Sequence, residues 1–189
     1  MTRTKPPFRA EHVGSLLRPH DLLAARDKHQ GGALSAAQLR KAEDQAIRAA
    51  VPMQEDVGLR GVTDGEFRRA TWHLDFLYQV GGVTKSGQNL KIHFRNEHGE
   101  LEFTSAALRI AEKLHFNHCI FADDFRFLRS ITRATPKLTI PSPSMMHYGG
   151  GRAAIDPAIY PDLDEFWRDL GEFYAAQLTA LGDLGCTYL

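Results

Sequence analysis

The segment Gly58-Leu-Arg-Gly-Val-Thr-Asp-Gly-Glu-Phe-Arg-Arg69 contains the pattern that decides the fold. Residues 61–64 are a short β-branched stretch, which predicts a strand, and Asp64-Gly65-Glu66 then predicts an acidic turn. From residue 67 to residue 78 the apolar side chains return at helical spacing. We therefore expect a strand, an acidic turn and a helix in this order.

Helices are predicted on both sides of this segment. Ser35 and Gln38 are spaced as in a capping box, which marks the start of a long helix. Pro52 lies inside that helix and is expected to remove one hydrogen bond and kink the axis. Including this one, apolar periodicity and end signals predict four helices besides the one over residues 67–78. They span residues 19–31, 35–56, 122–132 and 162–182.

The remaining segments predict strands and one inserted hairpin. Alternating apolar residues over 90–94 resume over 101–103 after the polar turn 96–99, which predicts a β-hairpin inserted near residues 89–104. Short apolar stretches predict the main strands, at residues 8–17, 61–64, 108–114 and 137–140, with a fifth beginning at Cys186.

Strands that alternate with helices predict βαβ crossovers and a mostly parallel sheet within one α/β domain, residues 1–189. Two architectures remain open at this point. One is an open doubly wound sheet, although no Gly-x-Gly-x-x-Gly follows the first strand. The other is a (β/α)₈ TIM barrel, which needs roughly 250 residues, so this chain would be truncated at the start of the fifth strand.

Composition excludes several classes of partner. The 23 Lys and Arg balance the 23 Asp and Glu, so there is no basic excess for a nucleic acid or an anionic membrane surface. No apolar run approaches the roughly 20 residues of a membrane span, and the N-terminus lacks the apolar core of a secretory signal. We expect a cytoplasmic protein in which Cys119 and Cys186 are reduced thiols.

Three polar clusters fall at the predicted strand ends, at residues 12–15, 64–66 and 142–144. The Gly14-Ser15 turn exposes backbone N–H groups suited to a carboxylate or a phosphate, or it is an ordinary tight turn. Glu66 is placed to meet a cationic group, or it is an acidic residue at a helix N-terminus with Asp64 as the cap.

Other residues have weaker signals. Residues 72–76 mix polar and aromatic groups, which suits a pocket wall or core packing. His147-Tyr148 precedes three glycines and suits either a substrate-contacting loop or a surface turn. His115, His118 and Cys119 are poorly spaced for one zinc site.

Three motifs in the order of the chain resemble one family. They are His12-Val-Gly-Ser-Leu-Leu-Arg-Pro19, the segment of residues 58–69 with Trp72-His-Leu-Asp-Phe76, and Leu138-Thr-Ile-Pro-Ser-Pro-Ser144. Together they resemble the cobalamin-independent methionine synthase family, and most of all its short single-barrel members. The resemblance favours the (β/α)₈ barrel of the methionine synthase type.

The resemblance also implies an activity: zinc-dependent methyl transfer from a methylated folate-type donor to the thiol of homocysteine. The backbone amides of Gly14 and Ser15 would hold the homocysteine carboxylate, and Glu66 would hold its amino group. Zinc would convert the thiol to the thiolate. The substrate-binding residues expected from the resemblance and from the polar clusters above are His12, Gly14, Ser15, Asp64, Glu66, Trp72, His73, Ser142 and Tyr148.

The sequence also departs from that family. The family's zinc ligands begin with a His-x-Cys pair, and no such pair occurs in this chain. We therefore expect no metal ligand and assign no catalytic residue here, and zinc is expected only of the full-length family member. Two alternatives remain: another thiol alkyltransferase of the same superfamily, of the coenzyme M type, and a non-catalytic half-barrel that needs a partner.

Overall fold

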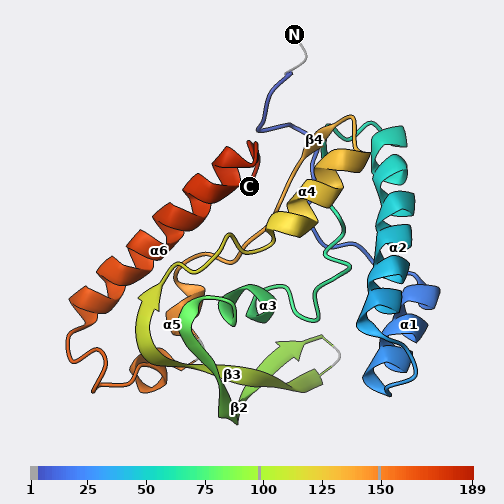
Figure 1. The fold of residues 1–189 in the computed structure, drawn as a ribbon. Helices are drawn as coiled ribbons and strands as arrows, with labels where there is room; N and C mark the ends of the chain where they lie inside the picture. Colours follow the sequence, from blue (N-terminus) through green and yellow to red (C-terminus); the bar gives the residue numbers. More distant parts are fainter. Residues whose placement is uncertain (1–3, 98, 149) are drawn as a thin grey trace. The chain divides into compact units, whose positions relative to one another are not determined.

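The computed structural model describes residues 4–97, 99–148 and 150–189. The chain is mixed α/β (Figure 1). It divides into two compact units. The first unit consists of Met1–Trp72, Phe121–Ile140 and Leu181–Leu189, and the second of His73–Ile120 and Pro141–Ala180. The expectation of one domain over residues 1–189 stays a prediction.

The four helices predicted at residues 19–31, 35–56, 122–132 and 162–182 agree closely with the structure. Ser35 caps α2 as expected, because its hydroxyl accepts from Gln38 N at 3.3 Å and its own N–H donates to Gln38 Oε1 at 2.9 Å. The helix continues through Pro52. In order, the helices are α1 (His20–Gln30), α2 (Ala36–Asp56), α3 (Leu74–Leu77), α4 (Ala122–Ile131), α5 (Met145–Tyr148), the 3-10 helix η1 (Gly151–Ala154) and α6 (Leu163–Asp183).

The described residues form two separate strand pairs and one isolated parallel bridge, between Ile110 and Ile155. In the first unit, β1 (Gly61–Val62) pairs in parallel with β4 (Thr135–Pro136). In the second unit, β2 (Gly81–Asn96) and β3 (Gly99–His115) form a long antiparallel hairpin (Figure 1). The hairpin confirms the predicted insertion and is longer than residues 89–104.

Several strand predictions were wrong. Residues 108–114 belong to β3 of the hairpin and are not a separate parallel strand. β4 lies two residues before the predicted start at residue 137. Residues 8–17 and 186–189 form no strand, because single backbone bonds, from Leu16 N to Gly65 O and from Leu138 N to Tyr188 O, take the place of a continuous ladder.

The predicted helix over residues 67–78 forms only at its end, as α3. An α-helix needs each carbonyl oxygen for the N–H four residues later. Here Arg69 N donates to Glu66 O, three residues earlier, at 3.1 Å, and the Arg18 guanidinium donates to the carbonyl oxygens of Glu66, at 2.9 Å, and Arg69, at 2.6 Å. Side chains from elsewhere in the chain therefore hold this loop, and helical periodicity alone did not reveal them.

The core of the first unit forms between α1, α2, β1 and α4. One face of α2 is buried, as the spacing of its apolar residues predicts. Phe67 closes this core from the loop that follows β1. The buried cluster consists of Leu22, Ile47, Ala50, Val51, Val62, Phe67 and Leu128.

The core of the second unit is aromatic. Phe76 from α3 packs on Phe173 and Tyr174 of α6, with ring centroids 6.1 and 5.9 Å apart. Tyr160 is fully buried, and its hydroxyl accepts from Leu114 N at 2.7 Å. None of the helices in the described ranges is long and apolar enough to cross a membrane.

Gln54 joins α2 to β1 and to the N-terminal segment. Its amide group donates to Thr63 O at 2.9 Å and accepts from Thr63 N at 2.9 Å, and only 1% of the residue is exposed. The same Oε1 lies 2.9 Å from His12 Nε2. Since Oε1 is an acceptor, Nε2 is the protonated nitrogen of His12.

We expect Gln54→Met to destabilise the protein by roughly 2 kcal/mol or more, because methionine fills the space but leaves buried backbone groups of Thr63 without their partner. Urea unfolding followed by circular dichroism measures the change. Gln38→Met, at the exposed start of α2, is the matched control and should cost less than about 1 kcal/mol. Equal losses in the two variants would contradict this role of Gln54.

Candidate functional site

The Gly14–Ser15 turn lies directly beside the turn that follows β1. The Ser15 hydroxyl donates to Glu66 Oε2 at 2.5 Å. The Thr63 hydroxyl donates to Gly14 O at 2.6 Å, and Leu16 N donates to Gly65 O at 3.1 Å. Two of the clusters singled out in the sequence therefore come together in the first unit.

Thr139 completes this group and was not found from the sequence. Its hydroxyl donates to Glu66 Oε1 at 2.6 Å, so each carboxylate oxygen accepts one hydroxyl. Thr139 follows β4 as Glu66 follows β1, and the carboxyl ends of parallel strands meet at one edge. Only the β1–β4 pairing, which was not known from the sequence, could have identified it.

Glycine is required at position 14 by close packing. A Cβ built on Gly14 would lie 2.6 Å from Thr139 Cγ2 and 3.0 Å from Glu66 Oε1. The turn can approach the carboxylate only because this Cβ is absent.

The backbone at Glu66 is unusual. Its φ is +57°, in the left-handed region, directly after Gly65 with a φ of +68°. The N–H of Glu66 donates to Asp64 Oδ1 at 2.9 Å. This turn directs the Glu66 side chain toward Ser15 and Thr139 instead of along a helix, so Asp64 acts on the shape of the turn.

Arg69 gives the carboxylate a nearby positive charge. Its Nη1 lies 3.6 Å from Glu66 Oε1, and its Nη2 donates to Thr139 O at 2.7 Å. Its guanidinium also lies over the ring of Phe121, 4.2 Å from the centroid. Glu66 is only 5% exposed, so the site is a buried carboxylate with two hydroxyl donors and one guanidinium.

Asp64 is buried and belongs to a charged network behind the turn. Burial raises its pKa above the ordinary value of 3.8, while the hydrogen bond from Glu66 N and the charge of Arg69 oppose the rise. Arg68 Nη1 lies 3.7 Å from Asp64 Oδ2, and Arg68 also pairs with Asp44 at 2.5 Å.

His12 is held from two sides. Gln54 contacts its ring, as described above, and the Lys137 ammonium donates to its carbonyl oxygen at 2.8 Å. Lys137 also pairs with Glu11 at 3.3 Å. These contacts fix the backbone that enters the Gly14–Ser15 turn.

The other predicted site residues are spread over the two units. Trp72 ends the first segment of the first unit and is 51% exposed. His73 and Ser142 belong to the second unit. Burial lowers the pKa of His73, and Ser142 is exposed with its hydroxyl 2.8 Å from that of Ser144. The backbone of Tyr148 ends α5, and its side chain lies outside the described part of the chain.

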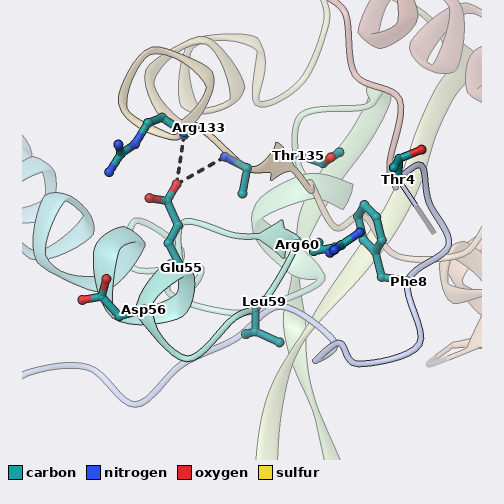
Figure 2. A pocket seen from close by; sticks show the side chains of 9 residues that line it. Thr4, Phe8, Glu55, Asp56, Leu59, Arg60, Arg133 and Thr135 are labelled. Carbon is teal, nitrogen blue, oxygen red and sulfur yellow. Dashed lines mark hydrogen bonds between the residues drawn. The ribbon is translucent and has the colours of Figure 1, made fainter. Parts of the chain in front are cut away.

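A pocket of about 520 Å³ lies at the other end of the β1–β4 pair (Figure 2). It is lined by residues that precede the two strands, among them Arg60 and Ala134, and by Phe8. The Glu55 carboxylate at its edge accepts from Thr132 Oγ1 at 2.6 Å and from the N–H groups of the next two residues at 2.9 and 3.3 Å. Glu55 therefore caps the chain before β4.

In the part of the chain that is described, no three His, Cys, Asp or Glu side chains gather as metal ligands. These residues do not fit a zinc centre.

The fold and the site define a mixed α/β protein whose polar groups meet at the carboxyl ends of parallel strands. Its structural neighbours are members of the cobalamin-independent methionine synthase family, which confirms the resemblance seen in the sequence. No protein-family model matches the chain.

Two solved structures illustrate the similarity. A candidate vitamin-B12-independent methionine synthase from Listeria monocytogenes is 36% identical with a TM-score of 0.80, over 99% of this chain and 52% of that chain. A B12-independent methionine synthase from Shewanella sp. W3-18-1, solved in complex with selenomethionine, is 18% identical with a TM-score of 0.64. It covers 92% of this chain and 48% of that one, and it supports the fold alone.

Two curated relatives come from Bacillus subtilis strain 168. The uncharacterized protein YxjH is 41% identical over 186 residues, and the uncharacterized protein YxjG is 38% identical over 191 residues. The matches cover 98% and 100% of this chain but 48% and 49% of those proteins. The chain thus spans about half the length of the curated relatives it matches.

We expect Gly14→Ala to destabilise the first unit by about 1–3 kcal/mol, because the new methyl group overpacks against Thr139. Thr139→Ser removes Cγ2 and keeps the hydroxyl, so it should recover part of the loss in the double variant. A double-mutant cycle of urea unfolding curves measures the coupling. Simple additivity of the two single changes would contradict the packing argument.

Glu55→Gln should weaken the protein most at neutral pH. The hydrogen bond from Thr132, with those from Arg133 N and Ala134 N, holds the pKa of Glu55 below its ordinary value of 4.5. The stabilisation is therefore present above pH 4.5 and is lost as the pH falls through the lower folded-state pKa. Urea midpoints of the wild type and the variant should converge in acid. Asp56→Asn is the control from the same helical turn, and a gap independent of pH would contradict this assignment.

Proposed function

We propose that this chain supplies the amino-acid-binding part of a methyltransferase that acts on the thiol of homocysteine. The observation that carries the proposal is the pairing of the Gly14–Ser15 turn with the Glu66 carboxylate, only 2.5 Å from Ser15 Oγ. An amino acid has an anionic and a cationic end. In this proposal the backbone N–H groups of the Gly14–Ser15 turn meet the anionic end, and the Glu66 carboxylate beside them meets the cationic end.

The chemistry of Glu66 suits an ammonium ligand. A carboxylate has about four lone-pair positions, and here each oxygen accepts one hydroxyl. A lone pair on each oxygen is therefore left for the N–H groups of an ammonium. The hydroxyls of Ser15 and Thr139 fix the plane of the carboxylate, so little ordering remains to be done when the ligand binds.

The proposed reaction of the whole protein is methyl transfer from a methylated folate-type donor. The thiolate sulfur of homocysteine attacks the methyl carbon, the bond from that carbon to the donor nitrogen breaks, and the nitrogen takes up a proton. The products are methionine and the demethylated donor. Because the described residues hold no zinc-type ligand set, this chain is assigned only the binding of the amino acid.

The architecture that we propose for the whole protein is a (β/α)₈ barrel. The β1–β4 pair is parallel, and the helices α2 and α4 pack beside it. Glu66 and Thr139 follow these strands, and active sites of such barrels lie at the carboxyl ends of the strands. This chain matches 52% of the length of the Listeria structure, which supports the proposal that the whole protein is longer than this chain.

We expect Glu66→Gln to reduce the affinity for homocysteine at least tenfold, equivalent to about 1.4 kcal/mol. The amide keeps the shape of the side chain and removes the charge that meets the ammonium. Isothermal titration calorimetry of the full chain measures both affinities.

Glu172→Gln, an exposed acid on α6, is the control and should bind as the wild type does. Coenzyme M, a thiol without an amino group, tests the alternative thiol alkyltransferase. Binding of coenzyme M in preference to homocysteine, or unchanged homocysteine binding in Glu66→Gln, would overturn the proposal.

A further inference from the structure

The residue that presents the carboxylate has a backbone conformation that needs support. Gly65 and Glu66 both have positive φ, and Glu66 is not a glycine. Left-handed backbone in a residue with a side chain persists only where its surroundings hold it. The contacts made by the Glu66 backbone therefore decide where its carboxylate points.

Arg18 makes the contacts that hold this turn from outside. Its Nη2 donates to Glu66 O at 2.9 Å and to Arg69 O at 2.6 Å. The two carbonyls lie at the two ends of a four-residue turn that Arg69 N closes by donating to Glu66 O at 3.1 Å, and the Arg18 nitrogen bridges both ends of this turn. Both bonds go to main-chain atoms, and neither bond involves the Glu66 carboxylate.

The same short segment also holds the Glu66 side chain. Ser15 donates to the carboxylate, Leu16 N donates to Gly65 O, and Arg18 donates to Glu66 O. Residues 15–18 thus form hydrogen bonds with both the backbone and the side chain of the Gly65–Glu66 turn. A shift of this segment relative to the turn would change both at once.

We propose that Arg18 is a positioning residue for ligand binding, which holds Glu66 in the left-handed conformation that directs its carboxylate to Ser15 and Thr139. It acts through Glu66 and does not touch the ligand. This inference rests on the proposed function, since the ligand is the amino acid whose ammonium meets Glu66.

The test uses Arg18→Ala in the full chain with millimolar methylguanidinium as a substitute for the missing group. Homocysteine affinity, measured by calorimetry, should fall at least tenfold in the variant and recover in part when methylguanidinium is added. A variant that is merely destabilised would not recover, because guanidinium compounds favour unfolding. Arg126→Ala removes an exposed arginine that pairs with Asp123. This variant should bind homocysteine as the wild type does, and added methylguanidinium should not raise its affinity.

A second measurement does not depend on the ligand. Amide hydrogen exchange of peptides covering residues 64–69 should speed up in Arg18→Ala and slow again with methylguanidinium. Arg18→Lys, which keeps a donor but shortens its reach, undergoes the same measurements and replaces Arg18→Ala if the latter does not fold.

Wild-type affinity in folded Arg18→Ala would overturn the inference, and so would wild-type affinity in Arg18→Lys if exchange at residues 64–69 were nevertheless faster. A loss of affinity without rescue and without faster exchange at residues 64–69 would also overturn it. If the wild type itself does not bind homocysteine, the proposed function fails, and the exchange experiment alone decides whether Arg18 holds the turn.

Discussion

The burial of the Glu66 carboxylate is the constraint on which the first unit depends. A buried carboxylate is costly unless donors replace the water that it loses. Here the donors come from segments far apart in sequence: Ser15 precedes α1, and Thr139 follows β4. Arg69 adds a positive charge 3.6 Å away. These segments must assemble together, because a carboxylate with only one of its partners would be buried with its charge poorly satisfied.

Arginine side chains supply much of the order around this carboxylate. The Arg18 guanidinium meets main-chain carbonyls of the turn, while the Arg68 guanidinium pairs with carboxylates behind it. Arginine suits this work because its planar fork presents several donors in fixed directions and stays charged. The charge of Arg68 is balanced by Asp44, at 2.5 Å, and by Asp64, so burial does not isolate it. The turn is therefore held by backbone and ion-pair contacts together.

Features that depend on residues close in sequence were predicted, whereas features that depend on residues far apart in sequence were missed. The capping box of Ser35, the buried face of α2 and the inserted hairpin follow from residues close in sequence, and the structure confirms them. Thr139 was missed because its place beside Glu66 depends on the pairing of β1 with β4. The predicted helix over residues 67–78 forms only at its end, as α3, and the Arg69 carbonyl before it accepts from Arg18, which is some fifty residues away.

A glutamate lies at each end of the β1–β4 pair, Glu55 at the amino ends and Glu66 at the carboxyl ends. The two differ in how easily a ligand could replace their present hydrogen-bond donors. At the amino ends, Glu55 accepts from backbone N–H groups that precede β4 (Figure 2). A ligand that took this carboxylate would leave those backbone donors unpaired, which costs free energy. At the carboxyl ends, Glu66 accepts from the hydroxyls of Ser15 and Thr139, which can rotate. A ligand could therefore share the Glu66 carboxylate without disturbing the main chain, and this difference favours the carboxyl ends over the pocket at the amino ends as the proposed binding site.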